Sequence, residues 1–282
     1  MELAAQFFEE QLHGRAGAKA RGYLRDREIS GPAQKQFRLG YAPAERFALC
    51  DWLAAKEVPV EVMTESGLLI HGEDIAVPYD RFRDRVMFPI EDIRGRVIAF
   101  GGRALEKDVP AKYLNSPETP LFHKGATLYN LHRARKAAHE GAAVVAVEGY
   151  VDVIAMVAAG FPGAVASCGT ALTPEQCEAL WKMSAEPTLC FDGDRAGRKA
   201  AFRALDVAMP MLGPDRSFRF ALLPEGQDPD DLARSGGADA LQDVLDQSRP
   251  LVELLWSREV EAAGDLTTPE RRAGLERRLD EV

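Results

Sequence analysis

The sequence has little that would mark a disulfide framework, a zinc site or a membrane protein. Only four cysteines occur in 282 residues, at positions 50, 168, 177 and 190, and no two of them form a CxxC pair. Structural zinc sites need paired Cys or His ligands at short spacing, so we expect no zinc in this chain and small buried thiols instead. The most apolar stretch, 142–166, is interrupted by Glu148 and Asp152, which argues against a membrane span.

A secretion signal, an internal repeat and a low-complexity run are also missing. The first residues form an amphipathic segment with acidic side chains, where a leader peptide would have a basic region. The chain is 46% hydrophobic and 28% charged, which is typical of a globular protein and excludes a disordered chain. These features predict a soluble, cytoplasmic protein with one large domain or two ordinary ones.

A positive net charge is lacking as well. The chain has 44 acidic and 35 basic residues, and a formal net charge of −9 argues, as a total, against a polyanionic partner such as DNA or RNA. The charges are unevenly divided, however: residues 1–140 carry 21 Lys/Arg and 20 Asp/Glu, whereas residues 141–282 carry 14 and 24. Windows 11–47 and 75–136 each have a net charge of +5. The two halves therefore need separate electrostatic interpretations.

Hydrophobic patterning predicts a mixed α+β first half. Short helices are expected in the first forty residues. The runs 86–90 and 97–100 flank the turn-like Arg94-Gly95-Arg96, which predicts an antiparallel strand pair. Segment 106–127 is rich in Pro, Gly, Asn and Ser, and we expect an ordered loop with little regular structure there.

After residue 132, short apolar runs alternate with helical stretches. The predicted strands are 144–147, 164–166, 188–191 and 218–222. Thr173 is a plausible N-cap for the helix that starts at Pro174. This alternation predicts an α/β unit with a mostly parallel sheet flanked by helices. From residue 238 the pattern predicts helices.

Acidic side chains follow three of the four predicted strands. They are Glu148, then Asp192 and Asp194, then Asp228 and Asp230. Ligands of open α/β sheets bind beyond the carboxyl ends of the strands, so we expect these five carboxylates at one edge of the sheet. They would repel one another strongly unless cations neutralise them, and oxygen ligands favour Mg²⁺, Mn²⁺ or Ca²⁺ over zinc. Any one pair alone could be a turn with a capping carboxylate, but three at strand ends favour a metal site.

These motifs resemble a known signature. The sequence is similar to the Toprim signature of primases, topoisomerases and related nucleases at 148–152, 192–197 and 228–231. It also resembles bacterial DnaG-type primases in motifs that occur in the family's order: FRLGYAP (37–43), RVMFPI (85–90), FGGR (100–103) and KYLNSPET (112–119). The resemblance covers roughly residues 15–250 and is specific, because both the order and the spacing of the motifs match.

The resemblance implies a primase catalytic core in three parts. These are a basic N-terminal subdomain (1–123), a Toprim metal-binding subdomain (124–250) and a truncated C-terminal helical subdomain (251–282), which would be the start of a C-terminal helical bundle. The implied activity is a DNA-directed RNA polymerase that makes short primers by two-metal nucleotidyl transfer with Mg²⁺ or Mn²⁺. The implied partners are single-stranded DNA template, ribonucleoside triphosphates and RNA primer. The replicative helicase and a zinc-binding domain would act through regions absent from this chain, which we expect to be a monomer at the bacterial replication fork.

The resemblance also assigns roles to individual residues. It makes Glu148, Asp192 and Asp194 catalytic, and it makes these three together with Asp228 and Asp230 the metal ligands, supported by Asp152. The nucleotide-binding or nucleic-acid-binding candidates are Arg27, Arg85, Arg103, Lys112, Asn115 and Lys124, with Arg85 the weaker one. Two alternatives stay open: a Toprim-containing nuclease or topoisomerase fragment, and a non-catalytic Toprim module that binds nucleic acid or nucleotide.

Overall fold

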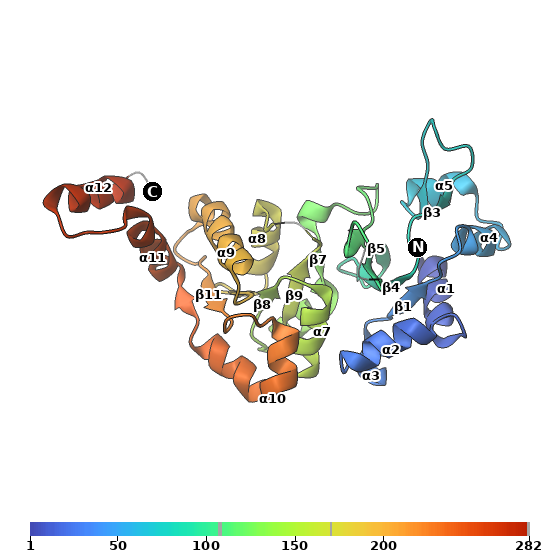
Figure 1. The fold of residues 1–282 in the computed structure, drawn as a ribbon, viewed down its shortest axis with the longest axis horizontal. Helices are drawn as coiled ribbons and strands as arrows, with labels where there is room; N and C mark the ends of the chain where they lie inside the picture. Colours follow the sequence, from blue (N-terminus) through green and yellow to red (C-terminus); the bar gives the residue numbers. More distant parts are fainter. Residues whose placement is uncertain (107–108, 170, 281–282) are drawn as a thin grey trace.

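Two β-sheets lie side by side in the computed structural model, which describes residues 1–106, 109–169 and 171–280 (Figure 1). The first half of the chain builds an antiparallel sheet with helices at its outer side, and the second half builds a larger sheet covered by helices. The last two helices extend away from the second sheet at the end of the molecule opposite the first sheet. The predicted mixed α+β first half and α/β second half are confirmed.

The first half contains five helices and six strands among its described residues. The helices are α1 (Glu2–His13), α2 (Ala18–Asp26), α3 (Gly31–Gln36), α4 (Ala48–Ala54) and α5 (Val60–Glu65). The strands are β1 (Gly40–Ala42), β2 (Leu69–Ile70), β3 (Tyr79–Asp80), β4 (Arg85–Glu91), β5 (Val97–Ala104) and β6 (Tyr113–Asn115). Strands β1-β4-β5-β6 form the first sheet, and β2 and β3 form a separate hairpin.

The predicted antiparallel pair is confirmed as β4 and β5, and it is longer than the apolar runs suggested. The register runs from Arg85 opposite Ala104 to Glu91 opposite Val97. The described part of segment 106–127 has little regular structure, as predicted, and its exceptions are strand β6 and the short 3-10 helix η1 (Lys124–Ala126). The residues of β6 pair with Gly101 to Arg103, the part of β5 that extends past the predicted apolar run.

The second half follows the predicted alternation. As far as β10, its elements are η1 (Lys124–Ala126), β7 (Leu128–Tyr129), α6 (Leu131–His139), β8 (Val145–Val147), α7 (Tyr150–Ala158), β9 (Ala164–Ser167), α8 (Pro174–Trp181) and β10 (Thr188–Phe191). The remaining ones are α9 (Arg195–Ala208), η2 (Met209–Met211), β11 (Arg219–Leu222), α10 (Pro229–Asp246), β12 (Arg249–Pro250), α11 (Leu251–Ala263) and α12 (Pro269–Asp280). The sheet order is β12-β11-β10-β8-β9-β7.

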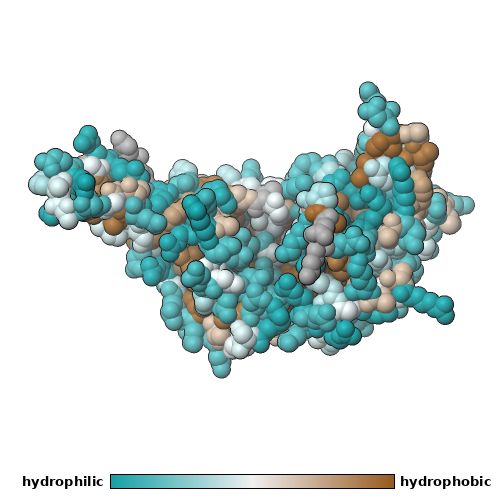
Figure 2. Space-filling model, in the orientation of Figure 1, coloured by the Kyte–Doolittle hydropathy of each residue, from teal (hydrophilic) through white to brown (hydrophobic). Residues whose placement is uncertain are grey.

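The four central strands of the second sheet run parallel, and only the edge strands β12 and β7 are antiparallel. A mostly parallel sheet places the carboxyl ends of its strands at one edge, which is where ligands of such sheets bind. Thr173 caps α8 as predicted: its hydroxyl accepts a hydrogen bond from the backbone N–H of Gln176, and the Gln176 side chain completes a capping box. In the described part of the chain, no helix combines the length and hydropathy that a membrane span needs, and the face of the molecule drawn in Figure 2 is mainly hydrophilic.

The two sheets share one hydrophobic core, which fixes their relative positions. Phe88 of β4 stacks on Tyr150 of α7 with ring centroids 5.2 Å apart. Gly101 of β5 is required at this contact, because a Cβ there would lie 2.5 Å from the Tyr150 ring. The hydroxyl of Tyr150 donates to Asn115 Oδ1 over 2.8 Å, which adds a polar link between the sheets.

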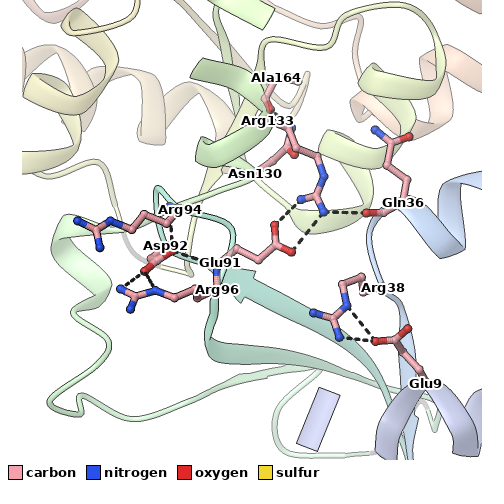
Figure 3. A network of polar contacts seen from close by, with 10 residues as sticks. All are labelled: Glu9, Gln36, Arg38, Glu91, Asp92, Arg94, Arg96, Asn130, Arg133 and Ala164. Carbon is pink, nitrogen blue, oxygen red and sulfur yellow. Dashed lines mark hydrogen bonds and ion pairs between the residues drawn. The ribbon is translucent and has the colours of Figure 1, made fainter. Parts of the chain in front are cut away.

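An ion pair reinforces this junction farther along β4. The guanidinium of Arg133 on α6 contacts both carboxylate oxygens of Glu91, at 2.5 and 3.2 Å, and also donates to the backbone carbonyl of Gln36 (Figure 3). Glu91 is 8% exposed, so the pair is largely removed from water. Helix α6, which packs on the second sheet, is thereby tied to both β4 and α3.

Candidate active site

The structure places acidic residues after three adjacent strands of the second sheet. Glu148 directly follows β8, and Asp192 directly follows β10. The backbone N–H of Asp192 donates to Glu148 Oε1 over 3.2 Å, so the two strand ends are in contact. Asp228 follows β11 after a short loop and begins α10. The convergence that the sequence predicted therefore exists at this edge.

Two of the acids also cap helices. Asp194 Oδ1 accepts a hydrogen bond from the backbone N–H of Gly197 at the start of α9, and Asp228 Oδ1 accepts one from Asp231 at the start of α10, both at 2.7 Å. Each capping carboxylate uses only Oδ1, and its Oδ2 has no hydrogen bond within the described residues. Capping thus fixes the orientation of both side chains and leaves an oxygen for another ligand.

The third acidic segment forms a tight group of carboxylates. Oxygens of Asp228, Asp230 and Asp231 lie within 4.8 Å of one another. Asp230 is 1% exposed and forms an ion pair with Arg27 of the first half at 2.5 Å. Asp231, which the sequence analysis did not select, pairs with Arg234 one turn later in α10. Its position in the Asp-Pro-Asp-Asp run was the only available signal for it.

Burial and mutual repulsion raise the pKa of several of these carboxyls. Burial, followed by the neighbouring charges of Glu148 and Asp228, raises the pKa of Asp192 to about 7. Burial likewise raises the pKa of Glu148, and Asp194 adds to that effect. Oδ1 of Asp192 is buried and has no hydrogen-bond partner in the described residues. A cation would satisfy this oxygen and neutralise the cluster, so the donor set fits a hard divalent ion.

Asp152 lies in the first turn of α7, four residues after Glu148. It is 9% exposed, and the backbone N–H of Asp230 donates to it. Burial and the charges of Asp228 and Asp192 raise its pKa well above the ordinary value for aspartate. The supporting role of Asp152 stays a prediction.

Arginines of the first half face the acids across Tyr23. The guanidinium carbon of Arg103 lies 4.1 Å from the centroid of the Tyr23 ring, and that of Arg27 lies 5.9 Å away. The Tyr23 hydroxyl is buried without a hydrogen-bond partner in the described residues. Tyr23 was not selected as a site residue from the sequence, although its position one turn before Arg27 on α2 was a signal. The ring holds both arginines at the margin of the acidic cluster.

Two of the predicted binding residues are engaged within the protein. The Arg85 guanidinium donates to the backbone carbonyls of Gly102, Ala111 and Lys112, at 3.0 to 3.3 Å. Asn115 donates from Nδ2 to the Cys168 carbonyl over 2.7 Å, and its Oδ1 accepts from Tyr150. Both side chains thus hold the 106–127 segment in place, and a direct role of either in binding remains a prediction.

The predicted lysines are differently placed. The side chains of Lys112 and Lys124 have no hydrogen bond or ion pair in the described ranges, and the Lys112 ammonium lies 6.0 Å from the Tyr113 ring centroid. Lys124 begins η1, whose backbone is fixed to α8 because Gln176 Nε2 donates to the carbonyls of Lys124 and Thr127. Both ammonium groups are therefore available to an anionic ligand, on a segment that is anchored.

Comparison with known proteins agrees with this organisation. Residues 7–135 match the family model for the N-terminal domain of the DNA primase catalytic core, and residues 142–217 match the model for the Toprim domain. The parallel sheet with acids at its carboxyl edge is accordingly that of a Toprim-containing protein. The alternative of a topoisomerase or nuclease fragment is not favoured, because the first half matches the primase-specific model.

Individual proteins similar to this chain point to one family of Toprim-containing proteins. A solved DNA primase domain from Pseudomonas aeruginosa superimposes with a TM-score of 0.92 at 43% identity, covering 97% of this chain and 85% of that one. A structure described as the DnaG primase catalytic domain bound to single-stranded DNA superimposes with a TM-score of 0.88 at 40% sequence identity. The match covers 97% of this chain and 84% of that one. The DNA primase of Escherichia coli K12 is 41% identical over 95% of this chain and 46% of its own length.

The chain belongs to the bacterial DnaG-type DNA primase family, and it corresponds to that family's catalytic core. It spans less than half the length of the curated relatives that it matches: 39% of the Pseudomonas aeruginosa primase, at 45% identity, and 46% of the Escherichia coli one.

Proposed function

We propose that this chain is a catalytic core that synthesises short RNA primers on a single-stranded DNA template. The observation that carries the proposal is the meeting of two opposite groups of charges. Carboxylates from three strand ends converge at one edge of the second sheet, and Arg27 of the first half contacts one of them, Asp230, at 2.5 Å. Such an edge can hold cations, and the adjacent basic groups can hold the phosphates of a nucleotide.

The residues have distinct roles in this proposal. Glu148, Asp192 and Asp194 would hold Mg²⁺ or Mn²⁺, with Asp228 and Asp230 completing the set. When bound, divalent cations stabilise charge on the attacking and leaving oxygens of nucleotidyl transfer. In that reaction the primer 3′-oxygen forms a bond to the α-phosphorus and pyrophosphate leaves.

The basic side chains would orient the triphosphate. Arg27 and Arg103 present forked guanidinium groups, which suit bidentate phosphate contacts, and Tyr23 holds them in place. Lys112 and Lys124 would add point charges from the 106–127 segment and η1. Arg85 and Asn115 would act by fixing the backbone of that segment, in addition to any direct contact. The template, the triphosphates, the primer and the helicase are thus proposed partners.

Ribonucleotide incorporation on a single-stranded template tests the proposal directly. We expect short RNA products that require the template and either Mg²⁺ or Mn²⁺. Nicking of supercoiled plasmid without nucleotides, in the absence of RNA synthesis, would instead support a nuclease. Divalent binding without either reaction, under conditions where a catalytic domain of a relative is active, would support a non-catalytic module.

A further inference from the structure

A second basic surface lies at the amino edge of the second sheet, away from the acids. This surface, which we call the α6 strip, consists of Arg94, His132, Arg135, Lys136, His139 and Lys182, all of them exposed. Helix α6 ends before β8 begins, and Lys182 follows α8 before β10 begins, so both elements present these residues where the parallel strands start. The carboxylates of the candidate active site lie where the same strands end.

Helix α6 supplies most of the strip from one face. His132, Arg135, Lys136 and His139 have the spacing i, i+3, i+4 and i+7, which aligns side chains along one side of a helix. The opposite face is apolar: Leu131, Ala134 and Ala137 are buried in the core. The strip therefore projects outward from a helix that is held firmly by its other side.

Residues from two other elements extend the strip. An open pocket of about 560 Å³ is lined by the four basic residues of α6, by Lys182 and by Ala138 and Met183, with no carboxylate among them. The turn between β4 and β5 packs against the other end, because a Cβ at Gly95 would lie 2.9 Å from Cε1 of His132. Arg94 is the exposed residue beside this glycine, and its guanidinium has no partner among the contacts drawn in Figure 3.

Ordinary helix electrostatics does not account for the whole strip. Cations in the last turn of a helix are favourable, which explains Lys136. It does not explain Arg94 and Lys182, which come from other elements. No side chain of the strip forms an ion pair with any described residue, and its four permanent cations, on Arg94, Arg135, Lys136 and Lys182, repel one another across the surface. The nearby acids are Glu140 and Glu178, together with Asp92, which already binds Arg96. A bound polyanion would offset the repulsion.

We propose that the α6 strip binds the sugar-phosphate backbone of a nucleic-acid duplex, at a contact separate from the candidate active site. No Phe, Tyr or Trp lines its described pocket, so the bases of a single strand would find no stacking surface there. Phosphate contacts need only positive side chains, and a duplex presents its phosphates outward. From His132 to His139 the helix rises about 10 Å, which matches about three base-pair steps of 3.4 Å.

Duplex binding by the whole chain, without metal or nucleotide, tests this inference independently of primer synthesis. The strip variant carries Arg135→Gln, Lys136→Gln and Lys182→Gln, and the matched control carries Arg15→Gln, Lys35→Gln and Arg277→Gln, which removes the same charge from exposed sites elsewhere. Fluorescence anisotropy with a labelled blunt duplex of about 20 base pairs reports affinity at increasing salt. Circular dichroism and thermal melting of each variant confirm that it is folded.

We expect the strip variant to lose at least tenfold in duplex affinity, and the control to lose less than threefold. The slope of log affinity against log salt should become shallower by up to about 2.7, since each lost phosphate contact contributes about 0.9. Equal losses in the two variants, or no loss in the strip variant, would overturn the proposal. Preferential binding of poly-glutamate over duplex, abolished in the strip variant, would overturn it in favour of an acidic protein partner.

Discussion

Charged side chains have different surroundings in the first and second halves of the molecule. Arginines of the first half are held by acceptors and rings: Arg85 donates to three backbone carbonyls, and Arg103 lies over Tyr23. Acids of the second half are gathered with few partners, so that burial raises the pKa of Asp192 to about 7 and one of its oxygens has no hydrogen bond. Arg85 and Arg103 are thus already held within the protein. The acidic edge, which is the carboxyl edge of the second sheet with Glu148, Asp192 and Asp228, instead requires a ligand.

This contrast explains why the net charge of −9 is a poor guide to function. The excess acid belongs to the half that would hold cations, and the phosphate-binding candidates belong largely to the other half. Among the described residues, the one ion pair that joins these basic candidates to the acids is that of Arg27 with Asp230. The predictions below separate the contributions of the two halves, beginning with the largest effect.

The largest effect is expected from the acidic edge. Asp192→Asn keeps the size of the side chain but removes a charge that the cation needs, so the rate of primer synthesis should fall by at least about a hundredfold. The fold should persist, because the substitution also removes a buried repulsion with Glu148 and Asp228. Steady-state kinetics and thermal melting check both statements. A variant with the activity of the wild type would exclude Asp192 from the catalytic set.

A smaller effect is expected where the halves meet. Arg27→Ala leaves the buried Asp230 without its main cation, and we expect the metal-free protein to lose about 2–3 kcal/mol of stability, since Arg27 is itself partly exposed. Saturating Mg²⁺ should recover part of this loss by neutralising the same carboxylate. Denaturant unfolding with and without Mg²⁺ provides the measurement, and Arg25→Ala on the exposed side of α2 is the matched control. Equal losses of unfolding free energy with and without Mg²⁺ would show that Asp230 is not part of the metal site.

The pH dependence of stability should reveal the acidic edge in the absence of metal. Glu148, Asp152 and Asp192 have pKa values raised by burial, so the folded state retains protons that the unfolded state has lost. Their contribution is fully present below about pH 4 and is lost as the pH rises through about 7. The free energy of unfolding should therefore fall over this range by more in the wild type than in Asp192→Asn. Identical pH profiles would contradict the raised pKa of Asp192.

The smallest effect concerns the ring between the two arginines. Tyr23→Leu removes a cation–π contact of roughly 1 kcal/mol, so the KM for ribonucleotides should rise only several-fold with little change in kcat. Tyr23→Phe keeps the ring and should resemble the wild type. If Tyr23→Phe were as defective as Tyr23→Leu, the buried hydroxyl would have to contact substrate or a bound ion itself.

Much of this organisation could be predicted from the sequence, because it depends on local patterns. Apolar runs followed by acids located β8, β10 and β11 together with Glu148, Asp192 and Asp228, and the parallel sheet then brought the acids to one edge. The predicted boundaries of the three subdomains are not tested by these findings and stay a prediction.

The remaining features depend on contacts between distant segments. Strand β6 has three residues in a Pro-rich and Gly-rich segment, and its pairing with β5 has no signature in the sequence. Asn115 is a plausible ligand-binding residue by type, but its side chain links the sheets through Cys168 and Tyr150, which lie more than thirty residues away. The pairing of Arg27 with Asp230 spans 203 positions, and only the folded structure shows it.

The central claim is that the acidic edge holds the divalent cations of nucleotidyl transfer, and a crystal soaked with Mn²⁺ tests it most directly. The account predicts anomalous density within roughly 2.0–2.6 Å of carboxylate oxygens of Glu148 and Asp192, and its loss in Asp192→Asn. Occupied Mn²⁺ sites elsewhere in the same crystals, with none at these two residues in the presence of a ribonucleoside triphosphate, would contradict the account.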